Sequence, residues 1–402
     1  MRVKQFILYS FRHAPWAVLA SLCSGLSNYL IIILLSQYYG LATGGEFRLL
    51  LSIVGLLTLF TLAEADKVAI RHLVMGKQGV VRPLVISRMR FSLIGTVVGT
   101  ITAVFFYQTG REIWLGILAA SLLLPLAFPT DLYAQIVQSQ KNFRKAALQS
   151  FIKYTILTSL AYFAGIWSVT VFTFVVVYYL CLTAINAFFL FLQPETFEPS
   201  SPEAALYRRE SLQLSVAGFF PVVLEHADKL LISYFLGLEK LALYTIGIST
   251  GRLISNVIKP TMAVYFPVLV NDRFSFGLLL IIFGTLTVAG IGASWPLYYY
   301  FSHVLGAEYA EAYPLAAIIL AGLGVYFISV VVYYSSVYHK HAKLSIPTMT
   351  SFLTALVTFA YLLFSLKVGG KYALLLSAAS YPLRDFLTLI LTLKLSRRAQ
   401  IS

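Results

Sequence analysis

Charged residues are scarce in this chain. They make up 11% of its 402 residues, whereas a soluble domain carries roughly 25%. Hydrophobic residues supply 59% of the chain, and the mean hydropathy is +0.82. A chain with so little charge and so much apolar surface is stable only with lipid as its solvent. We therefore expect an all-α integral membrane protein, because helices satisfy their own backbone hydrogen bonds in hydrocarbon.

Several chemical signatures are also missing. The sequence has no G-x-x-x-x-G-K-[ST] loop, no H-E-x-x-H motif and no C-x-x-C pair, which argues against ATP hydrolysis by a P-loop and against common zinc sites. Its two cysteines, Cys23 and Cys181, lie in apolar runs, as small buried residues do. We expect no enzyme activity, no metal and no organic cofactor. The connections between apolar runs are also too short for a folded extramembrane domain.

Twelve apolar runs are long enough to cross the hydrocarbon core, which takes about 20 helical residues. The first run is too long for the apolar part of a secretory signal, about 7–15 residues. The runs are roughly 15–39, 49–70, 91–107, 113–137, 147–166, 169–192, 211–236, 241–269, 276–300, 315–337, 346–366 and 372–393.

The basic residues between these runs predict the orientation. Of the 30 Lys and Arg residues, 19 fall on the side of the two termini and five on the opposite side. Positive residues favour the cytoplasmic side, so both termini are expected there, in a multi-pass protein of the bacterial cytoplasmic (inner) membrane. The net charge of +14 thus predicts contact with anionic membrane lipid rather than with nucleic acid.

The chain also divides into two related halves. Residues 36–53 resemble residues 233–249 with Gly40 matched to Gly237, an offset of 197. Residues 140–148 resemble residues 338–346 with Lys145 matched to Lys343, an offset of 198. We expect a six-helix bundle over 1–192, a Pro-, Ser- and Glu-rich cytoplasmic linker over 193–210 and a second bundle over 211–402. Transporters often place the substrate path between such repeats.

The run 211–236 carries charges near its middle. Glu225, Asp228 and Lys229 follow one another at i, i+3 and i+4, so they share one helix face. One interpretation is a self-neutralising set in which Glu225 pairs with Lys229. The other is a water-lined cavity in which Lys229 binds an anionic substrate and Glu225 or Asp228 takes a coupling ion, H+ or Na+.

The run 241–269 carries a polar stripe on an otherwise apolar helix. Its members recur every three or four residues: Thr245, Ser249, Arg252, Asn256 and Lys259. Arg252 lies near mid-membrane and has no acid close in sequence, which favours a cavity lining. Lys259 is nearer the cytoplasmic end, where snorkelling to the surface is an equal alternative.

Other polar residues are candidates for the same cavity or for interfacial roles. Lys67 belongs to a charged group at the end of the run 49–70 and is either a cavity cation or part of an interfacial cluster. Lys153 is a candidate for snorkelling. Asn28 matches Glu225 under the offset of 197, so both halves place a polar group at one depth.

The stretch HADKLLISYFLGLEKLALYTIGIS, residues 226–249, and the basic stretch QSQKNFRKAAL, residues 138–148, carry a family resemblance. They resemble the O-antigen-type (Wzx-like) polysaccharide flippases of the multidrug/oligosaccharidyl-lipid/polysaccharide exporter (MOP) superfamily. The resemblance implies two MATE-like bundles in a V that alternate access and flip an anionic, polyprenyl-diphosphate-linked oligosaccharide outward. It also implies glycan polymerase and glycosyltransferase partners. Lys229, Arg252, Lys259 and Lys67 would then face the diphosphate.

Two other functions stay open at this point. A cation-coupled drug or metabolite exporter of the same fold would need an acidic pocket for cationic drugs, whereas the central charges here are mixed. A membrane-embedded glycan polymerase or glycosyltransferase usually carries a large loop on the far side of the membrane. The longest such loop here, about 301–314, is small.

Overall fold

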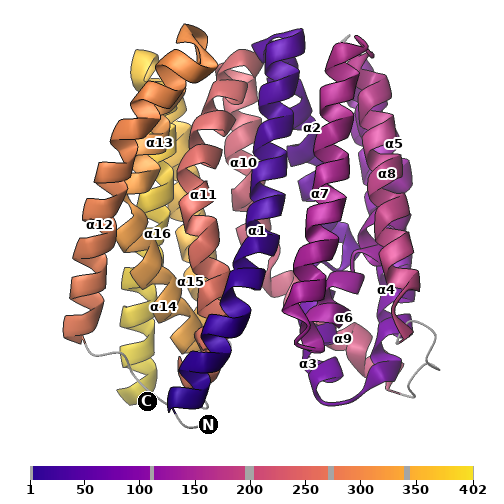
Figure 1. The fold of residues 1–402 in the computed structure, drawn as a ribbon, viewed down its shortest axis with the longest axis vertical. Coiled ribbons are helices and arrows are strands. Elements are labelled where there is room, and N and C mark those ends of the chain that lie inside the picture. The colour runs from indigo at the N-terminus through magenta and orange to yellow at the C-terminus, as the bar shows by residue number, and fades with distance from the viewer. Residues whose placement is uncertain (1–2, 109–112, 195–202, 270–275, 339–344, 402) are drawn as a thin grey trace. The chain divides into compact units, whose positions relative to one another are not determined.

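The computed structural model of this chain is built of helices that run roughly parallel or antiparallel within each part (Figure 1). It describes residues 3–108, 113–194, 203–269, 276–338 and 345–401, and no strand lies in these ranges. The expected all-α membrane fold is confirmed.

Contacts divide the chain into two units. The N-terminal unit is Leu34–His226, and the C-terminal unit is Met1–Ile33 together with Ala227–Ser402. Both boundaries fall inside continuous helices, α1 (Val3–Tyr39) and α10 (Phe219–Phe235). The sequence predicted a boundary in the segment 193–210. The contacts place it later, inside α10, because α9 (Ala204–Ala217), which begins within that segment, packs on α3 and α4 of the N-terminal unit.

The N-terminal unit contains two kinds of helix. Its long helices α4, α5 and α8 pack together with α2. Its short helices α3, α6 and α9 gather at one end of the unit (Figure 1), around a shared apolar cluster that includes Leu62, Val68, Leu132 and Tyr207. Its helices are α2 (Leu41–Leu57), α3 (Ala65–Val74), α4 (Val81–Gln108), α5 (Ile113–Thr130), α6 (Tyr133–Ser139), α7 (Phe143–Ile166), α8 (Val171–Phe191) and α9 (Ala204–Ala217).

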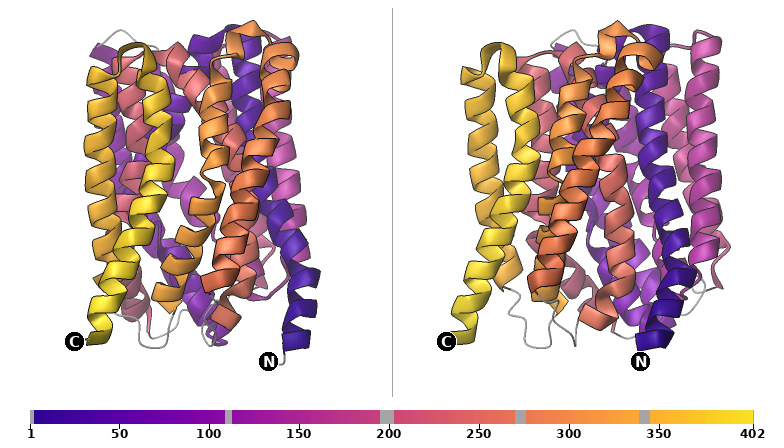
Figure 2. Two further views of the ribbon diagram at one scale, coloured as in Figure 1. Left: turned by 90° about the vertical axis from the view of Figure 1, so that its left-hand side faces the viewer. Right: turned by 60° about the vertical axis from the view of Figure 1, so that its left-hand side comes forward.

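The C-terminal unit is completed by the first helix of the chain. Tyr29 of α1 donates a hydrogen bond to the hydroxyl of Tyr300 at 3.1 Å. The start of α1 and the end of the last helix lie at the same end of this unit (Figures 1 and 2). Its other helices are α11 (Leu238–Leu269), α12 (Phe276–Tyr299), α13 (Ala312–Ala321), α14 (Leu323–Tyr338), α15 (Ser345–Val368) and α16 (Ala373–Ile401).

Eight helices in the described ranges are long and apolar enough to cross a membrane, and the bent pair α13–α14 makes a ninth if it counts as one span. These nine coincide with nine of the twelve expected runs. The other three runs, 147–166, 211–236 and 241–269, are also helical, as α7, as α9 with α10, and as α11.

One expected run has different ends. The span predicted over 49–70 begins at Leu41 and ends at Thr61. Leu62 then takes a positive φ of 53°, and a separate short helix, α3, begins at Ala65. The charged residues that follow Leu62 therefore lie outside the span. They include Lys67, whose ammonium group pairs with Glu64 of the same segment.

The two glycines matched between the halves occupy equivalent breaks between helices. Gly40 separates α1 from α2 with a φ of +93°, and Gly237 separates α10 from α11 with a φ of +89°. A Cβ at either position would meet nothing within 4 Å. Space is therefore not the reason for glycine at these positions. The reason is the positive φ, which residues with a side chain rarely adopt. The second match falls on Lys343, which lies outside the described residues.

Glycines of a different kind let helices of the C-terminal unit approach closely. A Cβ on Gly247 of α11 would lie 2.5 Å from the carbonyl oxygen of Ala312, and one on Gly290 of α12 would lie 2.1 Å from that of Leu320. Both contacts are made to the backbone of α13. Small residues bring helix backbones together in this way in membranes, where apolar burial gives little drive for association.

Helix α9 docks on α3 through both apolar and charged contacts. Tyr207 of α9 is buried, and its ring centroid lies 4.6 Å from that of His72 in a tilted arrangement; Nε2 of His72 lies 2.9 Å from the Glu210 carboxylate. Lys77 donates to Glu203 at 2.5 Å. This hydrogen bond lowers the pKa of the Glu203 carboxyl and raises the pKa of the Lys77 ammonium group.

The two glycines of α12 at 290 and 292 give a matched test of the close packing. We expect Gly290→Ala to lower the thermal unfolding midpoint of the purified chain in detergent, because overpacking typically costs about 1–3 kcal/mol. Gly292 is exposed and has nothing within 4 Å of an added Cβ. Gly292→Ala should therefore leave the midpoint unchanged or raise it slightly. Equal midpoints for the two variants would show that α12 does not depend on this approach.

Candidate functional site

A buried ion pair forms the centre of the site, in the C-terminal unit. The Lys229 ammonium group lies 2.8 Å from Oδ1 of Asp228, and each side chain is 4% exposed. The other carboxylate oxygen, Oδ2, accepts hydrogen bonds from Tyr381 of α16 at 2.8 Å and from Tyr244 of α11 at 3.0 Å. Three helices, α10, α11 and α16, therefore converge on one carboxylate.

This arrangement explains how two charges can be buried at this depth. A buried charge is tolerated when it is paired and its remaining hydrogen-bonding capacity is used. The Asp228 carboxylate also accepts from the backbone N–H of Lys229 at 2.9 Å, and the Lys229 ammonium group donates to the hydroxyl of Tyr381 at 3.0 Å. The pair is neutral as a whole, so the cost of burial is shared among several hydrogen bonds.

Tyr381 also faces two arginines. The guanidinium carbon of Arg252 lies 4.6 Å from the centroid of the Tyr381 ring, and that of Arg384 lies 5.2 Å from it. Both distances are within the range of cation–π attraction. Arg384 pairs loosely with Asp385, at 3.6 Å. One aromatic ring thus holds two arginines on different helices, α11 and α16.

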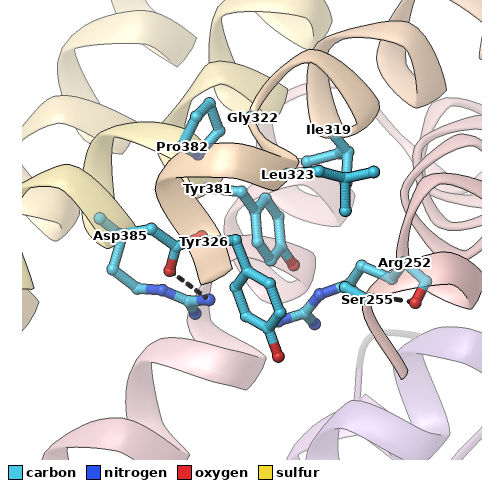
Figure 3. A pocket seen from close by; sticks show the side chains of 10 residues that line it. Arg252, Ser255, Ile319, Gly322, Leu323, Tyr326, Tyr381, Pro382 and Asp385 are labelled. Carbon is cyan, nitrogen blue, oxygen red and sulfur yellow. Dashed lines mark hydrogen bonds and ion pairs between the residues drawn. The ribbon is translucent and has the colours of Figure 1, made fainter. Parts of the chain in front are cut away.

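These arginines line a pocket at a break in the helices. Helices α13 and α14 meet at a break with a bend of 47°, and Pro382 of α16 lies against Gly322 at this bend. Figure 3 shows Arg252 reaching from one side toward Tyr381. Broken helices line substrate sites in many transporters, because irregular backbone is tolerated beside a cavity. The lining residues are Arg252, Ser255, Ile319, Gly322, Leu323, Tyr326, Tyr381, Pro382, Arg384 and Asp385.

The structure brings together some of the residues that the sequence proposed. Asp228, Lys229 and Arg252 meet at Tyr381. Arg252 was expected to need a partner from another span, and its guanidinium group lies over the ring of Tyr381 on α16. Lys229 pairs with the neighbouring Asp228, whereas the sequence proposed Glu225 one turn away.

The remaining candidates lie elsewhere or lack described side chains. Asn28 and Ser249 are half-buried in the C-terminal unit. Glu225 is exposed and belongs, by its contacts, to the N-terminal unit, as does the exposed Lys67. Asn256 and Lys259 continue the backbone of α11, but their side chains lie outside the described residues.

Sequence reasoning missed Tyr381 and Tyr244. The chain contains 26 tyrosines, so nothing in the sequence distinguishes the two that bind Asp228. Arg384 and Asp385 did carry a signal, since they are charges inside an apolar run after Pro382. That signal indicates pairing with other helices, but it does not identify the residues that connect α16 to α10.

A second charged network lies in the N-terminal unit. Lys153, considered for snorkelling, is instead buried and donates to Asp131 at 2.9 Å. Arg88 is 4% exposed and donates to Asp66 at 2.7 Å, and Gln135 donates to the other oxygen of Asp66 at 3.1 Å. The contacts of Asp66 join α3, α4 and α6, and Asp131 ties α7 to the turn between α5 and α6, which indicates a structural role for these pairs.

Residues 247–251, GISTG, match the G-x-S-x-G pattern of a nucleophile elbow, but they lie inside α11 rather than in a strand-to-helix turn. Gly247 and Gly251 serve the close packing with α13. Among the described residues, no group of three or more His, Cys, Asp or Glu side chains is placed to hold a metal ion. The described Cys23 and Cys181 are free thiols.

The buried pair predicts a difference between single and double substitutions. We expect Lys229→Met to lower the thermal unfolding midpoint strongly, because an uncompensated buried charge typically costs about 3–5 kcal/mol. Asp228→Asn combined with Lys229→Met removes both charges and should recover part of that loss. Melting of the purified full-length variants in detergent measures this. A double variant less stable than the single one would contradict the pairing.

Comparison with known proteins identifies the fold. No sequence family and no curated protein matches this chain. Solved structures do match: the MATE multidrug transporter DinF-BH has a TM-score of 0.62 at 13% identity, over 97% of this chain and 95% of its own. The eukaryotic MATE transporter AtDTX14 has a TM-score of 0.59 at 12% identity, over 98% and 95%. The Vibrio cholerae MATE transporter VcmN has 0.58 at 12%, over 98% of each. This chain is thus an all-α membrane protein of the MATE fold.

Proposed function

We propose that this chain is a cation-coupled exporter of a drug or metabolite. The fold supports this, because proteins with the same fold are MATE transporters and one of them is a multidrug transporter. A coupling ion needs a carboxylate inside the membrane, and Asp228 is buried there among polar partners. Ion binding at Asp228 would bias the protein between two conformations, as differential affinity requires.

The pocket supports an acidic substrate. Its lining contains two arginines and one carboxylate, Asp385, and the neighbouring Asp228 is neutralised by Lys229. The excess positive charge disfavours cationic drugs and favours a carboxylate or a phosphate. Arginine presents several donors in a fixed plane, which suits such planar or tetrahedral anions. This charge balance is the observation that carries the choice of substrate class.

The second candidate is a flippase for a polyprenyl-diphosphate-linked oligosaccharide, as the sequence resemblance implies. The same cations, Lys229, Arg252 and Arg384, favour it because a diphosphate needs positive groups inside the membrane. The prenyl tail would stay in lipid. Glycan polymerases and glycosyltransferases would be its partners in this case. Both candidates share one substrate feature, an acidic group.

Deletion of the gene in its host separates the two candidates. If the chain exports a soluble drug or metabolite, the deletion strain should retain acidic solutes that the parent strain exports, and its lipid-linked glycan should reach the outer leaflet normally. If the chain is a flippase, glycan lipid should accumulate on the cytoplasmic leaflet and re-expression should relieve it. Normal export and normal glycan placement, in a host without a redundant transporter, would remove both candidates.

Substitution of Arg252 tests the pocket itself. We expect Arg252→Ala to lower transport roughly ten- to a hundredfold at normal protein level, because a hydrogen bond to a charged group contributes about 1.5–3 kcal/mol. Lys371→Ala is the matched control: Lys371 also lies over a tyrosine ring, that of Tyr372 at 5.1 Å, but outside the pocket. Transport by Arg252→Ala at the level of the control would remove Arg252 from the substrate site.

A further inference from the structure

One side chain, Tyr381, belongs to both polar parts of the C-terminal unit. Its hydroxyl is within the hydrogen-bond network of the buried pair, and its ring is part of the pocket wall. The proposed function gives these parts different tasks, ion coupling at Asp228 and substrate binding at Arg252 and Arg384. A transporter needs the two tasks to depend on each other.

The hydroxyl of Tyr381 is fixed by two charged partners. It donates to Oδ2 of Asp228 at 2.8 Å and accepts from the Lys229 ammonium group at 3.0 Å. Hydrogen bonds to charged groups are roughly twice as strong as those between neutral groups. Any change in the charge of Asp228 therefore changes the preferred position of this hydroxyl.

The ring of Tyr381 transmits its position to the arginines. Arg252 approaches the ring from α11, and Arg384 approaches it from the same helix as Tyr381. Cation–π attraction depends on the cation lying over the ring face. A tilt of the ring therefore changes the preferred positions of both guanidinium groups, and with them the geometry offered to an anion.

Tyr244 gives an internal contrast. Its hydroxyl donates to the same Oδ2 at 3.0 Å and its side chain is fully buried, but it does not line the pocket. It shares the contact with Asp228 and lacks the contact with the arginines. Among the described side chains, the ionisable groups facing this region are Lys229 on α10, Tyr244 and Arg252 on α11, Tyr326 on α14, and Tyr381, Arg384 and Asp385 on α16.

We propose that Tyr381 is a positioning residue that couples the state of Asp228 to anion binding by Arg252 and Arg384. This rests on the proposed function, because it assigns the pocket to an acidic group of the substrate. Neutralisation of Asp228, by a proton or a coupling ion, changes the acceptor of the Tyr381 hydroxyl. The ring then shifts, and the affinity of the pocket for the anion changes.

A double-mutant cycle tests this coupling. The probe is radiolabelled inorganic pyrophosphate, bound at equilibrium to the purified full-length chain in detergent. Asp228→Asn is introduced into the wild type, into Tyr381→Phe and into Tyr244→Phe. We expect Asp228→Asn to change the Kd at least threefold in the wild type and in Tyr244→Phe. In Tyr381→Phe, which keeps the ring and loses the hydroxyl, the fold-change in Kd caused by Asp228→Asn should be at least threefold smaller.

The outcomes distinguish failure of the coupling by Tyr381 from failure of the acidic-substrate proposal. Equal effects of Asp228→Asn in all three backgrounds overturn the role of Tyr381 and leave the acidic-substrate proposal standing. Absence of pyrophosphate binding to the wild type overturns both. If Asp228→Asn fails to fold, the paired change Asp228→Asn with Lys229→Met, which keeps the region neutral, takes its place in the same cycle with the same expected result.

Discussion

The ion pair of Asp228 and Lys229 sets conditions that much of the C-terminal unit must meet. Two charges can be buried in this unit only if they neutralise each other and are fully hydrogen-bonded. Those hydrogen bonds come from tyrosines on α11 and α16, so α10 must lie close to both helices. The unit also keeps its helices close without bulky side chains between them, as Gly247 and Gly290 allow where α11 and α12 meet α13. The polar centre and the glycine contacts are in this sense parts of one packing arrangement.

The polar centre has two regions of different charge. The deeper region around Asp228 is neutral and saturated with hydrogen bonds, whereas the pocket beside it carries an excess of positive charge from Arg252 and Arg384. A neutral, saturated region suits a small ion that exchanges one partner for another. A positive, open region suits an organic anion. A single tyrosine, Tyr381, contacts both regions, through its hydroxyl on one side and its ring on the other.

The sequence predicted the helices well, because the length of the apolar runs and the position of the basic residues between them follow from membrane crossing. It predicted less well where tertiary contacts override these signals. The expected span over 49–70 included the charged residues after Leu62. The span ends at Thr61 instead, because the positive φ of Leu62 breaks the helix. Lys153 is long enough to snorkel, but it is buried and paired with the carboxylate of Asp131, in the turn between α5 and α6. Tyr381 could not be identified, because tyrosine is common in this chain and its partners Asp228, Lys229 and Arg252 lie more than 120 residues away in sequence.

The membership of α1 in the C-terminal unit has a consequence for the order in which the protein folds. The hydroxyls of Tyr29 and Tyr300 are hydrogen-bonded across 271 residues of sequence. During synthesis α1 is made first, whereas the helices it completes are made last, with the whole N-terminal unit in between. Contacts of such long sequence separation form slowly. The first helix must therefore remain in the bilayer without its final neighbours until the rest of the chain has been inserted. Its strongly apolar sequence is compatible with lipid contact during that time.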